Sequence, residues 1–356
     1  MSSLPLSKRL ALEVARKIQN NLKELHPLKQ LFWECTLRCN LHCKHCGSDC
    51  KRTADVPDMP AEDFLRVVDS ITPRVNPHEV SIIITGGEPL MRNDLEQVGL
   101  ALYRRGYPWG MVSNGLAMTP ERLQKLMAAG LHSITISLDG FMDDHNWMRG
   151  NPQSYDRALD TIKMLVHEPE LKWDVVTCVN RRNYGYLEEM KDTLYNLGVR
   201  DWRLFTIFPV GRAALHPEFQ LTDEEFTGVM EFIKRTRKEG KIRVHYGCEG
   251  FLGKYEGEVR DRFYSCSAGI FTASVLSDGS ISSCPSIRSD FNQGNIYKDD
   301  FMDVWNNRFQ PFRNREWMKK GDCADCNFFR YCEGNGMHLR DENGDLLFCH
   351  LKRLHS

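Results

Sequence analysis

Three cysteines near the N-terminus have a spacing that suits metal chemistry. Cys39, Cys43 and Cys46 directly follow the apolar run LFWEC. A four-iron cluster has four corners, so a loop with three thiolates leaves one iron open to an outside ligand, much as catalytic zinc sites keep an open position. The alternative is a zinc site closed by a fourth protein ligand, for which the candidates are His42, His45 and Cys50.

The whole chain has 13 cysteines and a nearly balanced charge. Stable disulfides do not explain so many cysteines in a reducing compartment, which favours metal or cluster ligation. The N-terminal segment lacks a signal-peptide core and no long apolar run follows, so we expect a cytoplasmic chain without a transmembrane segment. The net charge of −1, from 47 basic and 48 acidic residues, gives no reason to expect a nucleic acid partner.

Strand and helix patterns alternate six times between residue 29 and about residue 240, which predicts a parallel sheet. The predicted strands are 30–35, 80–85, 110–113, 133–138, 174–179 and 202–207. Periodicity does not decide between an open doubly wound sheet and an incomplete barrel, but both gather the chemistry at the C-terminal ends of the strands. Beyond residue 240, short strands, turns and cysteines predict a small domain held by metal. The predicted domains are therefore 1–28, 29–240 and 241–356.

Helix signals support this organisation. Leu10, Val14, Ile18 and Leu22 recur at a spacing of four, which predicts an amphipathic helix over residues 7–25. We interpret it as a helix packed on the main domain, in preference to an element that docks a peptide or a membrane. The other signals are an N-cap at Thr119, a capping box from Thr222 to Glu225, and helix stops at Gly106, Gly130, Gly198 and Gly240.

The stretch CNLHCKHC after a first strand resembles the signature of the radical S-adenosylmethionine (SAM) superfamily. The resemblance implies a partial (β/α)6 barrel and a [4Fe-4S] cluster on Cys39, Cys43 and Cys46 that binds SAM. It also implies reductive cleavage of SAM to a 5′-deoxyadenosyl radical, which abstracts a substrate hydrogen. The residues that it assigns to SAM are Gly86, Gly87, Glu88, Ser113, Asn114, Ser137, Asp139 and Arg149, and Gly211-Arg212-Ala213 stands where related enzymes pack the adenine.

The later cysteines resemble the SPASM extension of this superfamily, which carries auxiliary iron–sulfur clusters. Those that match a distal cluster are Cys323, Cys326, Cys332 and Cys349, and those that match a proximal cluster are Cys266 and Cys284, with Cys248 as a candidate third ligand. One position departs from the family pattern, because Gly336 stands where a further cysteine is expected. Three possibilities stay open for the proximal site: a cluster with an open iron, a smaller cluster, or none. A zinc ribbon is the alternative for the distal set.

Such enzymes mostly modify peptides or proteins by oxidation, crosslinking or epimerisation, so the resemblance implies a peptide or protein substrate and an electron donor such as flavodoxin or ferredoxin. Pro285 argues against a sulfatase-maturing subtype, whose members carry an acid at that place. Two alternatives remain. One is a radical SAM enzyme that oxidises or epimerises a small molecule such as a sugar or aminoglycoside, and the other is a nonenzymatic zinc-binding protein. No catalytic acid or base is identified.

Overall fold

One ten-stranded sheet runs through the chain, which this computed structural model describes over residues 4–247 and 249–354. The strand order is β10-β9-β8-β1-β2-β3-β4-β5-β6-β7, and β8 and β1 to β7 are parallel. The strands are β1 (Gln30–Thr36), β2 (Ser81–Gly86), β3 (Trp109–Ser113), β4 (Leu131–Ser137), β5 (Lys172–Val179), β6 (Asp201–Thr206), β7 (Arg243–Tyr246), β8 (Thr272–Val275), β9 (Ser280–Ser282) and β10 (Gly294–Asn295).

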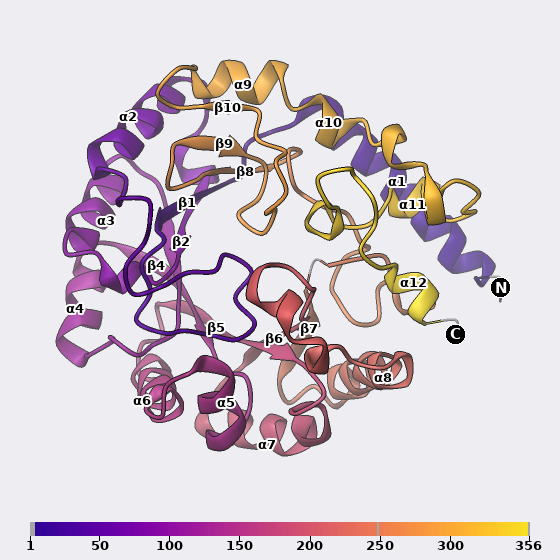
Figure 1. Cartoon of the computed structure of the whole chain (residues 1–356), viewed down its shortest axis with the longest axis horizontal. Helices are drawn as coiled ribbons and strands as arrows, with labels where there is room; N and C mark the ends of the chain where they lie inside the picture. The colour runs from indigo at the N-terminus through magenta and orange to yellow at the C-terminus, as the bar shows by residue number, and fades with distance from the viewer. Residues whose placement is uncertain (1–3, 248, 355–356) are drawn as a thin grey trace.

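The sheet curves, and most helices lie along its outer side (Figure 1). The helices are α1 (Leu6–Leu25), α2 (Ala61–Ile71), α3 (Leu95–Arg104), α4 (Pro120–Ala128), α5 (Met142–Arg149), α6 (Ser154–Val166), α7 (Leu187–Leu197), α8 (Asp223–Glu239), α9 (Phe301–Asn307), α10 (Gln310–Arg313), α11 (Phe329–Cys332) and α12 (His350–Arg353). In Figure 1 the long loop after β1 lies on the inner side of this curve, and the C-terminal segment, orange to yellow, lies on the side that α2 to α8 leave open.

Alternating burial along the strands explains the curved arrangement. In β2 and β4, Ile82, Ile84, Ile134 and Ile136 are fully buried or nearly so, whereas the residues between them are mostly half-buried. One face of each strand therefore packs beneath the helices and the other lines an interior. Because β10 and β7 are the two edges of the sheet, the barrel is incomplete. The partial barrel that the sequence resemblance implied is confirmed.

All six predicted strands are present within two residues of their predicted ends. The local signals also hold. The Thr222 side chain accepts from the Glu225 amide and the Glu225 side chain accepts from the Thr222 amide, and Thr119 caps α4. Gly198 and Gly240 end α7 and α8 in the left-handed conformation. Local chemistry fixes these helix ends without help from distant residues.

The sheet extends further than the alternating pattern indicated. β7 lies beyond residue 240 and adds a seventh parallel strand next to β6. β8 joins the opposite side, with Gln30 to Trp33 of β1 paired in parallel with Thr272 to Val275. The C-terminal region therefore continues the sheet of the barrel, and the division at residue 240 stays a prediction.

Helix α1 packs on the rest of the protein, as the interpretation held, but its contacts are with the C-terminal region and its apolar stripe is exposed. Leu10, Val14 and Ile18 are 60%, 59% and 53% exposed, whereas Leu12 is buried. The side of the helix that carries Leu12 and Glu13 contacts the protein: Glu13 accepts a hydrogen bond of 2.6 Å from the Tyr331 hydroxyl. Amphipathic spacing shows which residues share a face, but ion pairs and hydrogen bonds decided which face docks.

Substitutions on the two sides of α1 should differ sharply. We expect Val14→Lys to change the free energy of unfolding by less than about 0.5 kcal/mol, because the side chain already faces solvent. Leu12→Ala should cost about 2–5 kcal/mol, because it leaves a cavity in a buried contact. Anaerobic denaturant titration measures both. The reverse ranking would place the stripe inside the fold.

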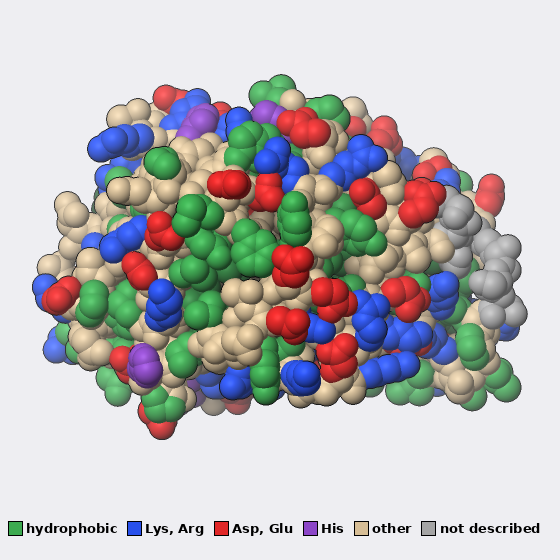
Figure 2. Space-filling model, turned by 90° about the horizontal axis from the view of Figure 1, so that it is seen from below, with side chains coloured by type: hydrophobic (Ala, Val, Ile, Leu, Met, Phe, Trp, Pro, Cys, Tyr) green, Lys and Arg blue, Asp and Glu red, His purple; other side chains and the backbone are tan. Residues whose placement is uncertain are grey.

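The surface shows no dominant charge on the face drawn in Figure 2, where acidic and basic side chains are interspersed with apolar ones. Within residues 4–247 and 249–354, every helix is too short or too polar to cross a bilayer.

Candidate functional site

A cavity of about 180 Å³ lies at the C-terminal ends of β1 to β4. Its walls bring together residues that are distant in sequence. They include the three loop cysteines (Cys39, Cys43, Cys46), seven of the eight residues that the sequence assigned to SAM (Gly86, Gly87, Glu88, Ser113, Asn114, Ser137, Arg149), and His45, Cys50 and Arg212. The convergence of strand ends thus places the predicted site residues around one space, with Asp139 as the exception.

The cysteine loop is held by contacts from across the barrel. Arg212, in the segment after β6, donates hydrogen bonds of 2.7 Å to the Cys43 carbonyl and 3.0 Å to the Cys50 carbonyl. Beside it, Gly211 lies so close to Gly47 that a Cβ would stand 2.4 Å from the Gly47 carbonyl oxygen. Arg212 therefore fixes the shape of the loop, a role that its loose motif did not reveal.

Two thiols of the loop receive polar hydrogen atoms. Nδ2 of the Asn114 side chain lies 3.9 Å from Cys39 Sγ, and Nη1 of Arg149 lies 3.8 Å from Cys43 Sγ. Burial raises the pKa of Cys39 to about 12, so in the absence of metal its thiol is protonated. Donors aimed at sulfur suit iron-bound thiolates, whose electron density such donors tune. The donor set therefore fits a cluster held by this loop.

Cys50 lies beside the loop cysteines, close to Cys46. A hydrogen bond from the Cys50 thiol lowers the pKa of Cys46 to about 5, although burial opposes the thiolate. Cys50 is buried and packs with Cys39 and Cys43. It therefore stabilises a Cys46 thiolate, and it is also the residue that a closed four-thiolate zinc site would use.

The two glycines after β2 allow close contact between backbones. A Cβ on Gly86 would stand 2.2 Å from the Thr36 carbonyl oxygen, and one on Gly87 would stand 2.2 Å from that of Arg38. Gly86 also has φ of +130°, which L side chains avoid. Both positions therefore need glycine, and the reason in this structure is packing on the start of the cysteine loop.

Glu88 is buried and connects the ends of β2 and β3. Its carboxylate accepts hydrogen bonds from the Ser113 hydroxyl at 2.8 Å, the Asn114 amide at 2.8 Å and the Leu90 amide at 3.1 Å. Burial raises the pKa of Glu88 in spite of these donors. Oε1 accepts two of these bonds and Oε2 only one, so Oε2 still has a lone pair for a ligand. Glu88 therefore combines a structural contact with a negative charge at the cavity.

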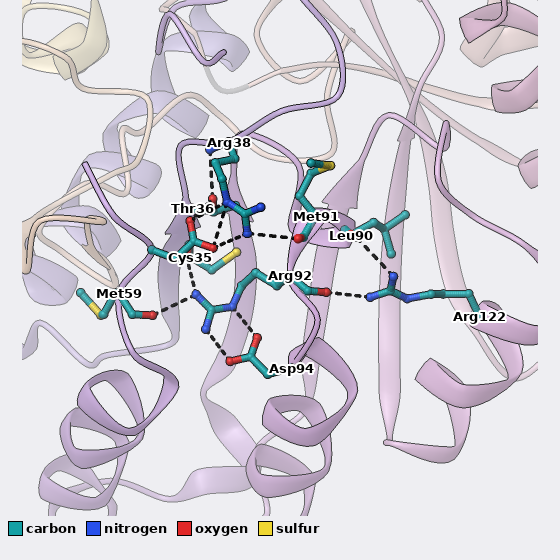
Figure 3. A network of polar contacts seen from close by, with 10 residues as sticks. Cys35, Thr36, Arg38, Met59, Leu90, Met91, Arg92, Asp94 and Arg122 are labelled. Atoms are coloured by element: carbon teal, nitrogen blue, oxygen red, sulfur yellow. Dashed lines mark hydrogen bonds and ion pairs between the residues drawn. The ribbon is translucent and has the colours of Figure 1, made fainter. Parts of the chain in front are cut away.

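A second network, of hydrogen bonds from arginine side chains, supports the loops around Glu88 (Figure 3). Arg92, almost fully buried, donates hydrogen bonds of 2.8 Å to the Cys35 carbonyl and 2.9 Å to the Met59 carbonyl. Arg38 donates to the Met91 carbonyl at 3.1 Å. These guanidinium groups join the end of β1 to the turn after Glu88, which keeps the two loops of the cavity in a fixed relation.

Asp139 lies behind the cavity wall. Its carboxylate accepts hydrogen bonds of 2.6 Å from Nε of Arg149 and 2.8 Å from the Cys178 amide. Although burial of Arg149 opposes its charge, Asp139 and Cys43 hold its pKa above the ordinary value. Asp139 is thus placed to orient Arg149. Ligand atoms of His45, Asp139 and Cys178 lie within 4.8 Å of one another, but Arg149 already neutralises this carboxylate.

The distal cysteines are gathered in the C-terminal region. Burial raises the pKa of Cys332, and the nearby thiols of Cys323, Cys326 and Cys349 add to the effect. The buried Arg340 guanidinium lies 3.4 Å from Cys323 Sγ. Four thiols in mutual electrostatic contact, with one cationic donor, fit a closed cluster or a zinc ion.

The proximal set is described only in part. Cys266 is buried, and although burial opposes its thiolate, the Arg315 charge and the Met337 amide lower its pKa. Cys284 is half-buried in the segment after β9. Cys248, the candidate third ligand, lies outside the described residues. Gly336 presents no ligand of its own.

Protein-family models match both parts of the chain. The radical SAM superfamily matches residues 33–194, and SPASM, an iron–sulfur cluster-binding domain, matches residues 266–327. The AdoMet-dependent heme synthase of Methanosarcina barkeri is 26% identical over 335 residues, covering 89% of this chain and 93% of the relative. The mycofactocin maturase MftC of Mycolicibacterium smegmatis is 28% identical over 317 residues, covering 86% and 77%.

Solved structures share the fold. Streptococcus suis SuiB bound to S-adenosylmethionine superposes with a TM-score of 0.69 at 18% identity, covering 94% of this chain and 79% of SuiB. The complex of SuiB with its precursor peptide SuiA also gives a TM-score of 0.69 at 18% identity, covering 90% and 75%.

These matches favour iron–sulfur clusters over zinc as the metal groups of this chain and set aside the nonenzymatic zinc-binding protein. The chain belongs to the radical SAM superfamily and carries a SPASM domain, so it is an enzyme that uses [4Fe-4S] clusters and S-adenosylmethionine.

Proposed function

We propose that this enzyme abstracts hydrogen from a peptide or protein substrate in a maturation reaction, by oxidation, crosslinking or epimerisation. When bound, the cluster and SAM supply the electron and the 5′-deoxyadenosyl radical, and the protein positions them and excludes water. The electron comes from a donor such as flavodoxin or ferredoxin, and the reaction takes place in the cytoplasm.

In this proposal different residues of the cavity bind the different polar groups of SAM. Cys39, Cys43 and Cys46 hold the cluster. Arg149 pairs with the SAM carboxylate, and Glu88 accepts from its ammonium group, since each charge is buried and faces the cavity. Asp139 acts through Arg149, as the residue that positions its side chain.

Likeness to proteins that act on peptides is the observation that supports a peptide substrate. MftC, named as a maturase, is 28% identical over 317 residues. SuiB, which shares the fold, was solved with its precursor peptide SuiA. Both comparisons support the same class of substrate.

A second candidate substrate is an iron porphyrin. It is favoured by the heme synthase of Methanosarcina barkeri, which aligns with 89% of this chain and 93% of its own length. The two candidates require different openings at the cavity, because a rigid porphyrin needs a wide slot and a peptide needs a groove.

Anaerobic turnover distinguishes the candidates. The enzyme is incubated with SAM and reductant in three arms: short peptides encoded beside its gene, iron porphyrins, and a sugar or aminoglycoside panel. Mass spectrometry follows 5′-deoxyadenosine and the substrate masses. We expect formation of 5′-deoxyadenosine to rise in the peptide arm. Oxidation or crosslinking should lower the mass of the peptide by the hydrogen atoms lost. Epimerisation in deuterated water should change that mass only by the uptake of deuterium. Conversion confined to the porphyrin or sugar arm would overturn the peptide proposal.

A further inference from the structure

A buried imidazole occupies the place of the missing proximal cysteine. If residue 336 had a side chain, its Cβ would stand 2.6 Å from Cε1 and 2.9 Å from Nδ1 of His338. Cε1 is bonded to both ring nitrogens, so the imidazole of His338 fills the space that a side chain at Gly336 would enter. The chain therefore lacks a thiol at this point but has another ligand type in the same space.

The imidazole has an unused ligand atom. His338 is only 9% exposed, and its Nε2 has no hydrogen-bond partner within residues 4–247 and 249–354. A buried ring nitrogen without a partner costs free energy in a finished fold. Its ring packs against Phe208 with centroids 4.8 Å apart, which holds the imidazole plane in place. The side chain is thus ordered, buried and chemically unsatisfied.

Cys266, one of the predicted proximal ligands, lies beside the same segment. The Met337 amide, next to His338, donates to the thiol of Cys266, and the Arg315 side chain donates to it as well. Nη1 of Arg315 also reaches the Asn335 carbonyl at 3.4 Å. On the other side, a Cβ at Gly336 would stand 2.8 Å from the Glu249 carbonyl oxygen.

We propose that His338 is an iron ligand of the proximal auxiliary cluster, together with Cys266 and Cys284, in place of a cysteine at position 336. Imidazole is a known ligand of iron–sulfur clusters, where it replaces thiolate and raises the reduction potential. The inference rests on the iron–sulfur content of the SPASM domain and does not depend on the substrate.

Nitrogen-sensitive spectroscopy tests this ligand directly. Enzyme labelled with ¹⁵N-histidine is purified anaerobically and reduced without SAM, whose own nitrogen would add a signal. Pulsed EPR should then show a ¹⁵N hyperfine coupling, and His338→Cys should remove it while it retains about 12 irons per chain, the content of three four-iron clusters. His338→Ala should lower the iron content towards about eight.

A matched control separates ligation from burial. His145 on α5 is also buried and its Nε2 also lacks a partner in the described part of the chain, so His145→Ala removes a comparable side chain. It should keep the iron content and the ¹⁵N coupling. The proposal fails if the wild-type enzyme shows no histidine coupling, or if the coupling survives in His338→Cys. Should His338→Ala misfold, the wild-type and His338→Cys spectra still decide, and neither depends on turnover.

Discussion

Replacement of Cys39, Cys43 and Cys46 by alanine should abolish 5′-deoxyadenosine formation, with a loss of at least about 100-fold to background. The three thiols come from one loop and line one cavity with the residues assigned to SAM, so no other part of this cavity offers three equivalent ligands. The variant should also lose about four irons per chain. Anaerobic iron and sulfide analysis and quantification of 5′-deoxyadenosine measure the two effects separately.

Cys50→Ala is the control within the same cavity. Cys50 is buried beside Cys46 but is not needed when one iron of the cluster stays open. We expect this variant to keep its iron and to change 5′-deoxyadenosine formation by less than about threefold. In a closed site that used Cys50 as a fourth ligand, this variant would lose metal as readily as the triple variant. Metal content equal to that of the triple variant therefore contradicts the open-corner arrangement.

Local patterns predicted the barrel well because its strands and helix ends are encoded over a few residues. Burial alternates along the apolar stretches of β2 and β4, and the capping box at Thr222 has both halves within four positions. The pairing of β1 with β8 could not be predicted in this way, since it joins Gln30 and Thr272. Nothing in either short segment specifies the other; packing of the whole fold decides their register.

Side-chain partners were the other part that the sequence left open. The spacing of α1 identified its apolar residues but not the contacts of Leu12 and Glu13 that leave the apolar stripe outside. Asp139 stands at a strand end, where a ligand contact is expected, yet its partners are Arg149 and the Cys178 amide. Gly336 was recognised as a missing ligand, but only the folded segment places the imidazole of His338 in its space. Each of these depends on three-dimensional direction, which residue spacing alone does not contain.

After the three loop cysteines, Arg149 should be the position where substitution has the largest effect. It should affect both SAM binding and the stability of the fold, and the two effects can be separated. It is only 8% exposed, pairs with Asp139 and lies 3.8 Å from Cys43 Sγ. Arg149→Met should weaken SAM binding by about 10- to 150-fold, because hydrogen bonds to charged groups contribute about 1.5–3 kcal/mol. It should also destabilise the fold by about 3–5 kcal/mol, because Asp139 is left buried without its partner.

The double variant Asp139→Asn with Arg149→Met separates the two effects. It removes both charges, and the side-chain oxygen of the introduced amide can still accept from the Cys178 amide, as Asp139 does at 2.8 Å. Most of the lost stability should therefore return, as measured by anaerobic thermal unfolding. SAM affinity, measured by equilibrium dialysis, should remain low, because the cation that pairs with the carboxylate is still absent. Recovery of both quantities would mean that Arg149 serves only to neutralise Asp139, and SAM would then be held by other groups of the cavity.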